Sequence, residues 1–148
     1  MQKNMVKSLT LWTEFQVRRA TARAAEQRRR LESAEQQART IVQYAGQMTE
    51  KGNQWLSNDE GCPAFLMRGA EGFQGTIQVV LATQRNTVEN LRDTYDGSLR
   101  QVHAAQQDAR RIAHVASQQV RRERAHADKA EQKLNDDLSG NQHLRKAR

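Results

Sequence analysis

Residues 17–48 read VRRATARAAEQRRRLESAEQQARTIVQYAGQM and decide the fold. The stretch has no proline, and apolar or small residues recur in it at alternating spacings of three and four. This stripe comprises Val17, Ala20, Ala24, Leu31, Ala34, Ala38, Ile41, Ala45 and Met48, with Gln27 as its one polar member. A 3.5-residue spacing that is sustained between charged flanks predicts a helix that packs in a coiled coil.

A second stripe with the same spacing lies in the C-terminal half of the chain. It comprises Val88, Leu91, Tyr95, Val102, Ala105, Ala109, Ile112 and Ala116. Between the two stripes the helix breakers gather, because six of the eight glycines and Pro63 lie within residues 46–75. We therefore predict one helix over about 8–50, a loop over about 51–70, a second helix over about 71–139 and a frayed tail over 140–148.

Two long helices around one connector predict an all-α fold in a single domain, 1–148. The expected architecture is a long two-helix antiparallel coiled-coil hairpin whose second helix is the longer one. If Met48 lies opposite about Phe73, the first helix ends opposite about residue 114, which leaves about 25 residues (115–139) of the second helix uncovered. Because an isolated helix of this length is marginal in water, we expect a partner for it.

The composition agrees with a hairpin better than with a globular protein. Leu, Ile, Val and Phe number 26 of 148 residues and the net charge is +7, which by composition alone is also a signature of disorder. The heptad spacing favours helices over disorder. The small number of large apolar residues is then expected, because a two-helix hairpin has little interior to fill. The basic excess lies on the flanks, with +5 over residues 1–51, −2 over 52–76 and +4 over 77–148. Such a balance favours acidic partners.

No pattern of enzyme chemistry is present, so we predict no catalytic residue, no metal and no cofactor. The chain has no phosphate loop, H-E-x-x-H or G-x-S-x-G motif, and none of its four histidines stands three or four residues from another. Cys62 is alone, in a predicted loop without a nearby histidine. A lone cysteine fits a reducing cytosol, and no apolar stretch is long enough to span a bilayer. We expect a soluble cytosolic protein without a secretory signal.

The basic runs have three readings. Arg28-Arg29-Arg30 and Arg121-Arg122 with Arg124 are consistent with a solvated helix surface, an acidic protein partner or contacts to phosphates. Consecutive residues on a helix point about 100° apart, so a run spreads around the helix instead of forming one stripe. Only seven aromatic residues are present, too few for a base-stacking platform. We therefore place the solvated surface first, the protein partner second and nucleic acid third.

Apolar residues beside the loop form a wider arc than a two-helix seam needs. Gln37, Ile41, Tyr44 and Met48 follow a 4-3-4 spacing on the first helix, and Phe73, Ile77, Val80 and Gln84 are their counterpart on the second. In the antiparallel register these two groups lie at the same level. They either pack the tip of the hairpin or form an exposed patch for a partner protein, and the residues alone leave both readings open.

Three segments carry a family resemblance. ESAEQQARTIVQYAGQMTEKG (32–52) resembles the end of the first helix in the flagellar export protein FliJ family, and GFQGTIQVVLATQR (72–85) resembles the start of its second helix. ARRIAHVASQQVRRERAHADKAEQKLNDDLS (109–139) resembles the family's basic stretch followed by an E-Q-K-x-x-D motif. The resemblance covers about residues 15–140, and its segments stand in the family's order around the loop.

The resemblance implies a non-enzymatic stalk of a flagellar or type III export apparatus, similar to the γ stalk of rotary ATPases. It implies three partners: a hexameric export ATPase, the cytoplasmic domain of a membrane export gate, and export chaperones. It also implies a cytoplasmic location at the inner face of the membrane export apparatus, and no small-molecule substrate. The gate-binding residues would be Gln37, Ile41, Tyr44, Met48, Phe73, Ile77, Val80 and Gln84, with Met48 in place of the usual second aromatic. We expect Phe15, Arg18, Arg19, Arg122 and Arg124 in the ATPase-facing end.

Two alternatives stay open at this point. A basic coiled coil associated with nucleic acid would bind with an affinity that falls steeply with salt, although 17 acidic residues interleave with the basic ones. A generic dimeric scaffold would pair residues 115–139 of two copies, so sedimentation separates it from a monomeric stalk.

Overall fold

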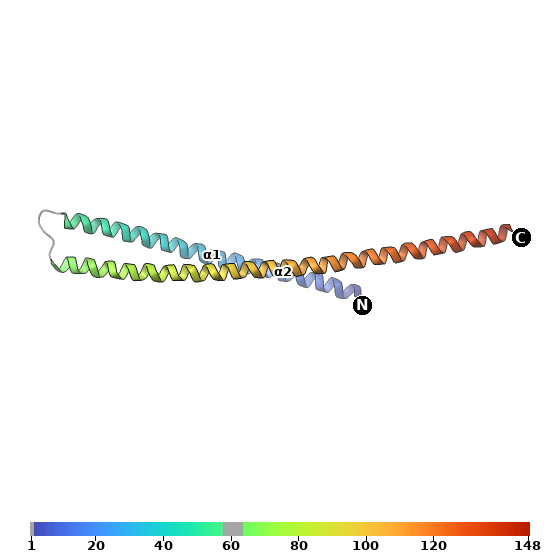
Figure 1. Ribbon diagram of the computed structural model, residues 1–148, viewed down its shortest axis with the longest axis horizontal. Coiled ribbons are helices and arrows are strands. Elements are labelled where there is room, and N and C mark those ends of the chain that lie inside the picture. The colour runs from blue at the N-terminus through green and yellow to red at the C-terminus, as the bar shows by residue number, and fades with distance from the viewer. Residues whose placement is uncertain (1, 58–63) are drawn as a thin grey trace. The chain divides into compact units, whose positions relative to one another are not determined.

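The computed structural model describes residues 2–57 and 64–148 and contains two helices, α1 (Gln2–Leu56) and α2 (Ala64–Lys146) (Figure 1). The fold is the predicted all-α antiparallel hairpin, and α2 is the longer helix. Part of the predicted loop, including Cys62 and Pro63, lies outside the described residues.

Both helices extend further than the sequence predicted. α1 begins at Gln2 instead of near residue 8 and continues to Leu56, and α2 includes residues 64–70 and 140–146. At the three helix ends other than the start of α1, the difference lies at glycines, Gly52, Gly69 and Gly140, which stay inside the helices and do not adopt a positive φ. A glycine costs about 1 kcal/mol in a helix relative to alanine, and a helix that has already formed can continue through such isolated costs.

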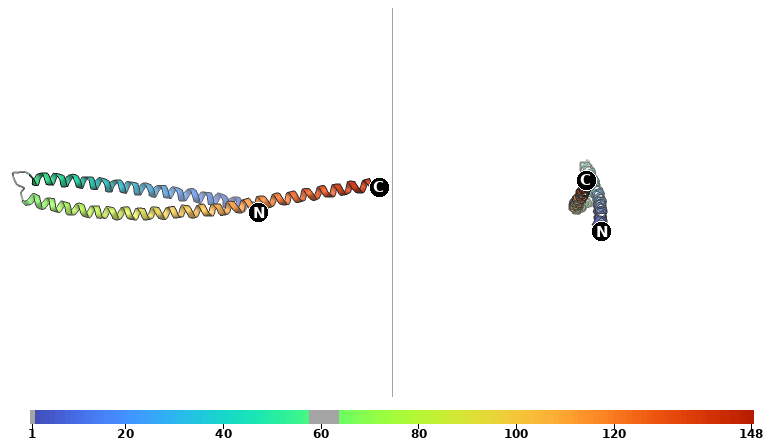
Figure 2. Two further views of the ribbon diagram at one scale, coloured as in Figure 1. Left: turned by 45° about the horizontal axis from the view of Figure 1, so that its top comes forward. Right: turned by 90° about the vertical axis from the view of Figure 1, so that its right-hand side faces the viewer.

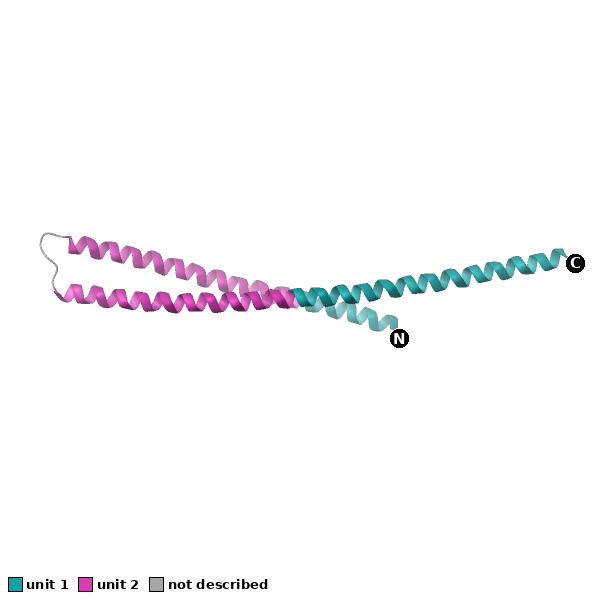
Figure 3. Ribbon diagram, viewed as in Figure 1, with its two compact units in different colours: residues 1–18, 103–148 teal, residues 19–102 magenta. Residues whose placement is uncertain are grey.

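Contacts divide the chain into two compact units, coloured separately in Figure 3. Unit 1 comprises residues 1–18 and 103–148, and unit 2 comprises Arg19–Val102. Each unit therefore contains a segment of both helices. In unit 2 the two segments run side by side, as the views of Figures 1 and 2 agree in showing.

The seam of unit 2 follows the predicted stripes. Ala24, Leu31 and Ala34 are the buried apolar residues of α1, with 5–8% of their surface exposed. Every other member of the stripe over residues 17–48, including Gln27, is half-buried. On α2 the half-buried positions run from Ile77 through Leu81, Gln84 and Val88 to Leu91 and Tyr95, again in steps of four and three. The predicted heptad pattern is thus the packing pattern.

Contacts across the seam fix the register of unit 2. The Gln84 side-chain amide donates a hydrogen bond to the backbone carbonyl of Ala34 at 3.0 Å, and the Arg92 guanidinium lies 3.2 Å from a carboxylate oxygen of Glu35. Nearer the tip the ring of Phe73 contacts Tyr44, one helical turn from the Met48 that we expected opposite it. The expected level was therefore right to within about one turn.

Unit 1 has a thinner seam that ends before α2 does. Thr13, the buried residue of its α1 segment, donates its hydroxyl to the carbonyl of Thr10, so this polar group is satisfied. On α2 the half-buried positions end at Gln119, and every residue from Val120 onward is exposed. A 3.8 Å ion pair joins Lys3 to Glu123.

The predicted uncovered segment is therefore displaced. We expected α2 to lack cover over 115–139, but Ala116 and Gln119 still contribute to the seam, and the uncovered part follows Glu123 and reaches Lys146. The cause is the earlier start of α1, whose additional first turns cover residues that a helix beginning at residue 8 could not reach. The uncovered helix remains about six turns long.

Candidate functional site

The eight residues expected to bind the export gate lie in unit 2 and divide into two classes. Four of them are half-buried seam residues: Ile41, Met48, Ile77 and Gln84. The other four flank the seam and are exposed: Gln37, Tyr44, Phe73 and Val80. Four of the residues therefore pack the hairpin and four are exposed, and binding of a partner at the exposed four stays a prediction. We call these eight residues the gate patch.

An aromatic pair joins the two helices within the gate patch. The rings of Tyr44 and Phe73 lie 6.3 Å apart between centroids and meet edge to face at 72°. Such pairs contribute about 0.5–1.5 kcal/mol beyond the area that they bury. Tyr44 is nevertheless 46% exposed and Phe73 40% exposed. The pair therefore presents a pre-ordered aromatic surface instead of a buried one.

Glutamines join the helices at the other end of the gate patch. The Gln84 amide nitrogen that bonds the carbonyl of Ala34 also lies 3.4 Å from the side-chain oxygen of Gln37. Val80, which is 42% exposed, lies one turn of α2 from Gln84. The structure thus brings predicted residues of both helices together, with polar contacts at one end and aromatic contacts at the other.

The residues expected to face the ATPase are not brought together in one cluster. Phe15, Arg18, Arg122 and Arg124 belong to unit 1, whereas Arg19 is the first residue of unit 2. The ion pair between Lys3 and Glu123 places Arg122 and Arg124 beside the first turn of α1. Phe15 lies twelve residues further along α1, which corresponds to about 18 Å.

The net positive charge is concentrated in unit 1. Its residues carry 13 basic and 7 acidic side chains, for a net charge of +6, whereas unit 2 carries 11 and 10, for a net charge of +1. In unit 2 the Arg28–Arg30 run is matched by glutamates on its own helix, with Arg28 2.9 Å from Glu32 and Arg30 3.2 Å from Glu26. Among the described residues, by contrast, no carboxylate lies within ion-pair distance of Arg122 or Arg124. These two cations are available to an external acidic group.

Sequence reasoning missed an apolar face at the start of α1. Of its large apolar residues only Phe15 was predicted to bind, but four more are exposed in the same segment: Met5, Leu9, Leu11 and Trp12. The rings of Trp12 and Phe15 lie 6.1 Å apart. The seam positions of this segment are 6, 10, 13 and 17, and none of these exposed residues occupies one of them. A second apolar period beside the seam was the signal that could have revealed them.

A second missed group lies at the tip of unit 2. Trp55, Leu56, Phe65, Leu66 and Met67 are between 43% and 70% exposed. The sequence placed all five in a loop, where no helical face could be assigned to them. Large apolar residues within a glycine-rich window were the available signal.

No group of three His, Cys, Asp or Glu side chains is placed to hold a metal ion in the part of the chain that the structure describes. No described helix is long and apolar enough to cross a membrane. The described surface has two regions of different character, an apolar tip in unit 2 and a basic unit 1.

Comparison with known proteins identifies one family. The sequence model of the family described as "Flagellar FliJ protein" matches residues 7–148, nearly the whole chain. This match confirms the resemblance that the three segments indicated. Searches of curated proteins and of solved structures returned no match.

Proposed function

The chain belongs to the flagellar FliJ protein family, and from this membership we propose that it is the non-enzymatic central stalk of a bacterial flagellar or type III protein export apparatus. The stalk inserts into the hexameric export ATPase, promotes assembly and activity of the ring, and links it to the cytoplasmic domain of the membrane export gate. It also binds export chaperones. It works in the cytoplasm, at the inner face of the membrane export apparatus.

The observation that carries the proposal is the exposed aromatic pair of the gate patch. Tyr44 and Phe73 contact each other across the two helices, yet each keeps at least 40% of its surface exposed. Aromatic residues that are held rigidly on a surface are typical binding anchors, because a partner can bury them at a small cost in conformational entropy. Two polar side chains, Gln37 and Gln84, border the apolar surface and supply directional contacts.

Replacement of both aromatic residues tests the gate assignment. We expect Tyr44→Ala with Phe73→Ala to weaken binding to the cytoplasmic domain of the gate at least tenfold and to abolish swimming, while far-UV circular dichroism stays unchanged. A matched control is Val42→Ala with Val79→Ala, which also truncates two exposed apolar residues of unit 2. Normal gate binding by the aromatic double variant would rule out the gate patch.

The basic character of unit 1 supports the ATPase assignment. Its net charge of +6 and the unpaired guanidinium groups of Arg122 and Arg124 suit an acidic pore lining. Electrostatic contacts of this kind tolerate several orientations, as a stalk within a ring of six subunits requires. Phe15 and the adjacent Trp12 add apolar contact area in the same unit, and Arg19 adds a cation at the start of the other.

Charge reversal tests the ATPase assignment. Arg122→Glu with Arg124→Glu should reduce binding to the ATPase and stimulation of its turnover at least tenfold at low salt. The control is Arg85→Glu with Arg100→Glu, which makes the same charge change in unit 2. If the two double variants stimulate the ATPase equally well, the ATPase contacts are not at Arg122 and Arg124.

A further inference from the structure

The seam opens into an apolar cleft at the tip of unit 2. If the heptad is continued beyond Gly52 on α1 it predicts Trp55 as a seam residue, and if it is continued backward from Ile77 on α2 it predicts Ala70 and Met67. All three are exposed, with Trp55 at 61% and Met67 at 44%. Between the two helix ends lies a cavity of about 800 Å³. We call this space the tip cleft.

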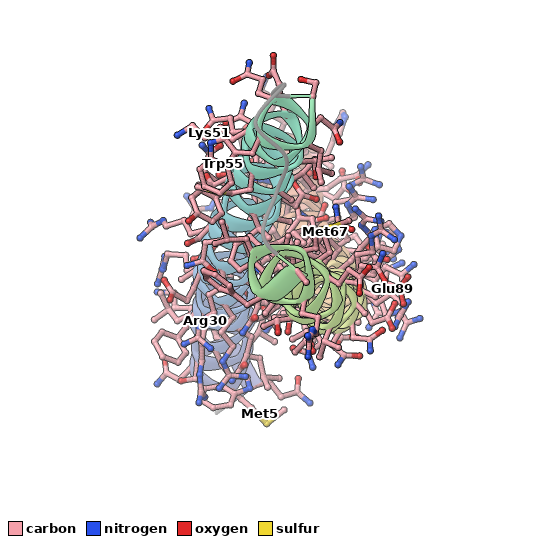
Figure 4. All side chains as sticks on the ribbon, turned by 90° about the vertical axis from the view of Figure 1, so that its left-hand side faces the viewer. Met5, Arg30, Lys51, Trp55, Met67 and Glu89 are labelled. Carbon is pink, nitrogen blue, oxygen red and sulfur yellow. The ribbon has the colours of Figure 1, made fainter. Side chains whose placement is uncertain are left out.

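The tip cleft has the form of a seat for a third helix. It is lined on α1 from Tyr44 to Leu56, a length of about 18 Å or a little over three helical turns. Its lining includes large apolar residues such as Trp55, Leu56 and Met67, and Figure 4 shows Trp55 and Met67 at the near ends of their helices. Heptad positions that the facing helix does not cover, on two neighbouring helices, can form the holes into which side chains of another helix insert.

Glycines of the tip cleft support the approach of another backbone. Gly52 on α1 and Gly69 on α2 line it, and a Cβ atom added at either position would meet nothing within 4 Å. Packing within this chain therefore does not require the absence of a side chain at either position, although each glycine costs the helix about 1 kcal/mol. Small residues at such positions let the backbone of a neighbouring helix come close.

Charge indicates which chemistry the occupant has. Among the described residues that line the tip cleft, Lys51 is the one cation and Glu71 the one anion. The recognition is therefore apolar, unlike that of the basic unit 1. Tyr44 and Phe73 line the cleft as well as forming the aromatic pair of the gate patch, so the two surfaces are continuous.

We propose that the tip cleft receives an amphipathic α-helix of about three turns from the export gate, which presents large apolar side chains at i, i+4 and i+7. The helix packs between the ends of α1 and α2 and completes a three-helix arrangement there. Recognition of this kind places an apolar helix face into a groove and reads it through a few anchors. This inference rests on the proposed gate-binding function and extends it beyond the gate patch to Trp55, Met67 and Gly69.

A variant that fills the cleft without damaging the helix tests this inference. Gly69→Leu adds a large side chain at a residue that lines the cleft, where a Cβ atom meets nothing within 4 Å, and it raises helix propensity, so we expect the full chain to stay folded. Its control is Gly72→Leu, since Gly72 is three residues away, is equally open and does not line the cleft. We expect Gly69→Leu to weaken binding to the cytoplasmic domain of the gate at least tenfold and Gly72→Leu to leave it unchanged. Equal binding by both variants would overturn the proposal.

Fluorescence gives a second and direct readout. In a Trp12→Phe background Trp55 is the only tryptophan of this chain. Its emission should shift to shorter wavelength when the gate domain binds, because an exposed indole becomes buried. Emission that does not shift at saturating gate domain contradicts occupation of the cleft.

The outcomes separate this inference from the proposed function. If the Tyr44→Ala with Phe73→Ala variant loses gate binding and Gly69→Leu does not, the cleft assignment alone fails. If the aromatic variant binds the gate normally, the gate patch itself is wrong. If Gly69→Leu instead converts a dimer to a monomer in sedimentation without changing gate binding, the occupant is a second copy of this chain, and the proposal is overturned.

Discussion

Truncation of Leu31 provides the sharpest test of where this hairpin gains its stability. Leu31 is a large apolar residue with only 8% of its surface exposed, among neighbours that are mostly alanine. Full burial of a leucine side chain is worth about 1.5–3 kcal/mol, and truncation to alanine in a core costs about 2–5 kcal/mol. A two-helix seam borders water, so water or neighbouring side chains can fill the space left behind. We therefore expect Leu31→Ala to cost about 2 kcal/mol, at the lower end of that range.

The matched control is Leu99→Ala, the same substitution on a residue of unit 2 that is 43% exposed and off the seam. Both variants gain the same few tenths of a kcal/mol in helix propensity, so this contribution cancels in their difference. Leu99→Ala should cost at most about 1 kcal/mol.

Thermal unfolding followed by far-UV circular dichroism measures both changes. For a chain of this length about 2 kcal/mol corresponds to a fall in Tm of about 4–8 °C. Urea titrations of the same variants should show a lower midpoint with an unchanged slope. If Leu31→Ala and Leu99→Ala lower Tm equally, the heptad seam is not what stabilises unit 2.

Three further measurements test the register, the uncovered helix and the two surfaces. Glu35→Arg should lower the free energy of unfolding by at most about 1 kcal/mol, and adding Arg92→Glu should restore it, because exposed ion pairs are weak but depend on geometry; a double variant less stable than the single one would contradict the register. Amide hydrogen exchange should be much faster over residues 124–146 than over 19–48, since the former have no helix packed on them; equal protection would mean that a second chain covers α2. Raising salt from about 50 to about 300 mM should weaken ATPase binding severalfold and leave gate binding nearly unchanged, because surface charges are screened and apolar contacts are not; equal salt dependence would refute the division into a basic and an apolar surface.

The sequence predicted the seam well because burial and periodicity have the same cause. Val17, Met48, Val88 and Ala116 and the stripe members between them are all buried or half-buried, as the 3.5-residue spacing required. Even Gln27, the polar member, occupies its place in the seam. Residues that face the partner helix must recur with the helical period, so this part of the fold can be predicted from the sequence.

The helix ends and the register were less predictable. Glycine disfavours a helix by only about 1 kcal/mol, so a cluster such as Gly69 and Gly72 signals a break that neighbouring hydrogen bonds can override. The register is weakly encoded because the seam is rich in alanine, and a slide of one heptad again places small residues opposite small ones. Specific contacts such as that of Gln84 with Ala34 fix it, and these depend on side-chain reach that periodicity does not describe.

The exposed apolar surfaces proposed to bind partners were the hardest to predict, for a physical reason that also favours their assignment. A two-helix hairpin buries one stripe on each helix, so an aromatic residue off that stripe is only partly buried when the chain folds. Trp12 lies off the stripe, and Trp55 lies where the stripe continues but the helices no longer cover it; each is more than half exposed. Folding alone leaves much of their apolar area in water, and binding of a partner at these residues is the arrangement that we propose to remove it. The two residues stand in surroundings of different charge, Trp12 in unit 1 with its net charge of +6 and Trp55 at a tip cleft whose described lining residues include one cation and one anion. Two partners of different chemistry, one acidic and one apolar, fit this division better than a single partner does.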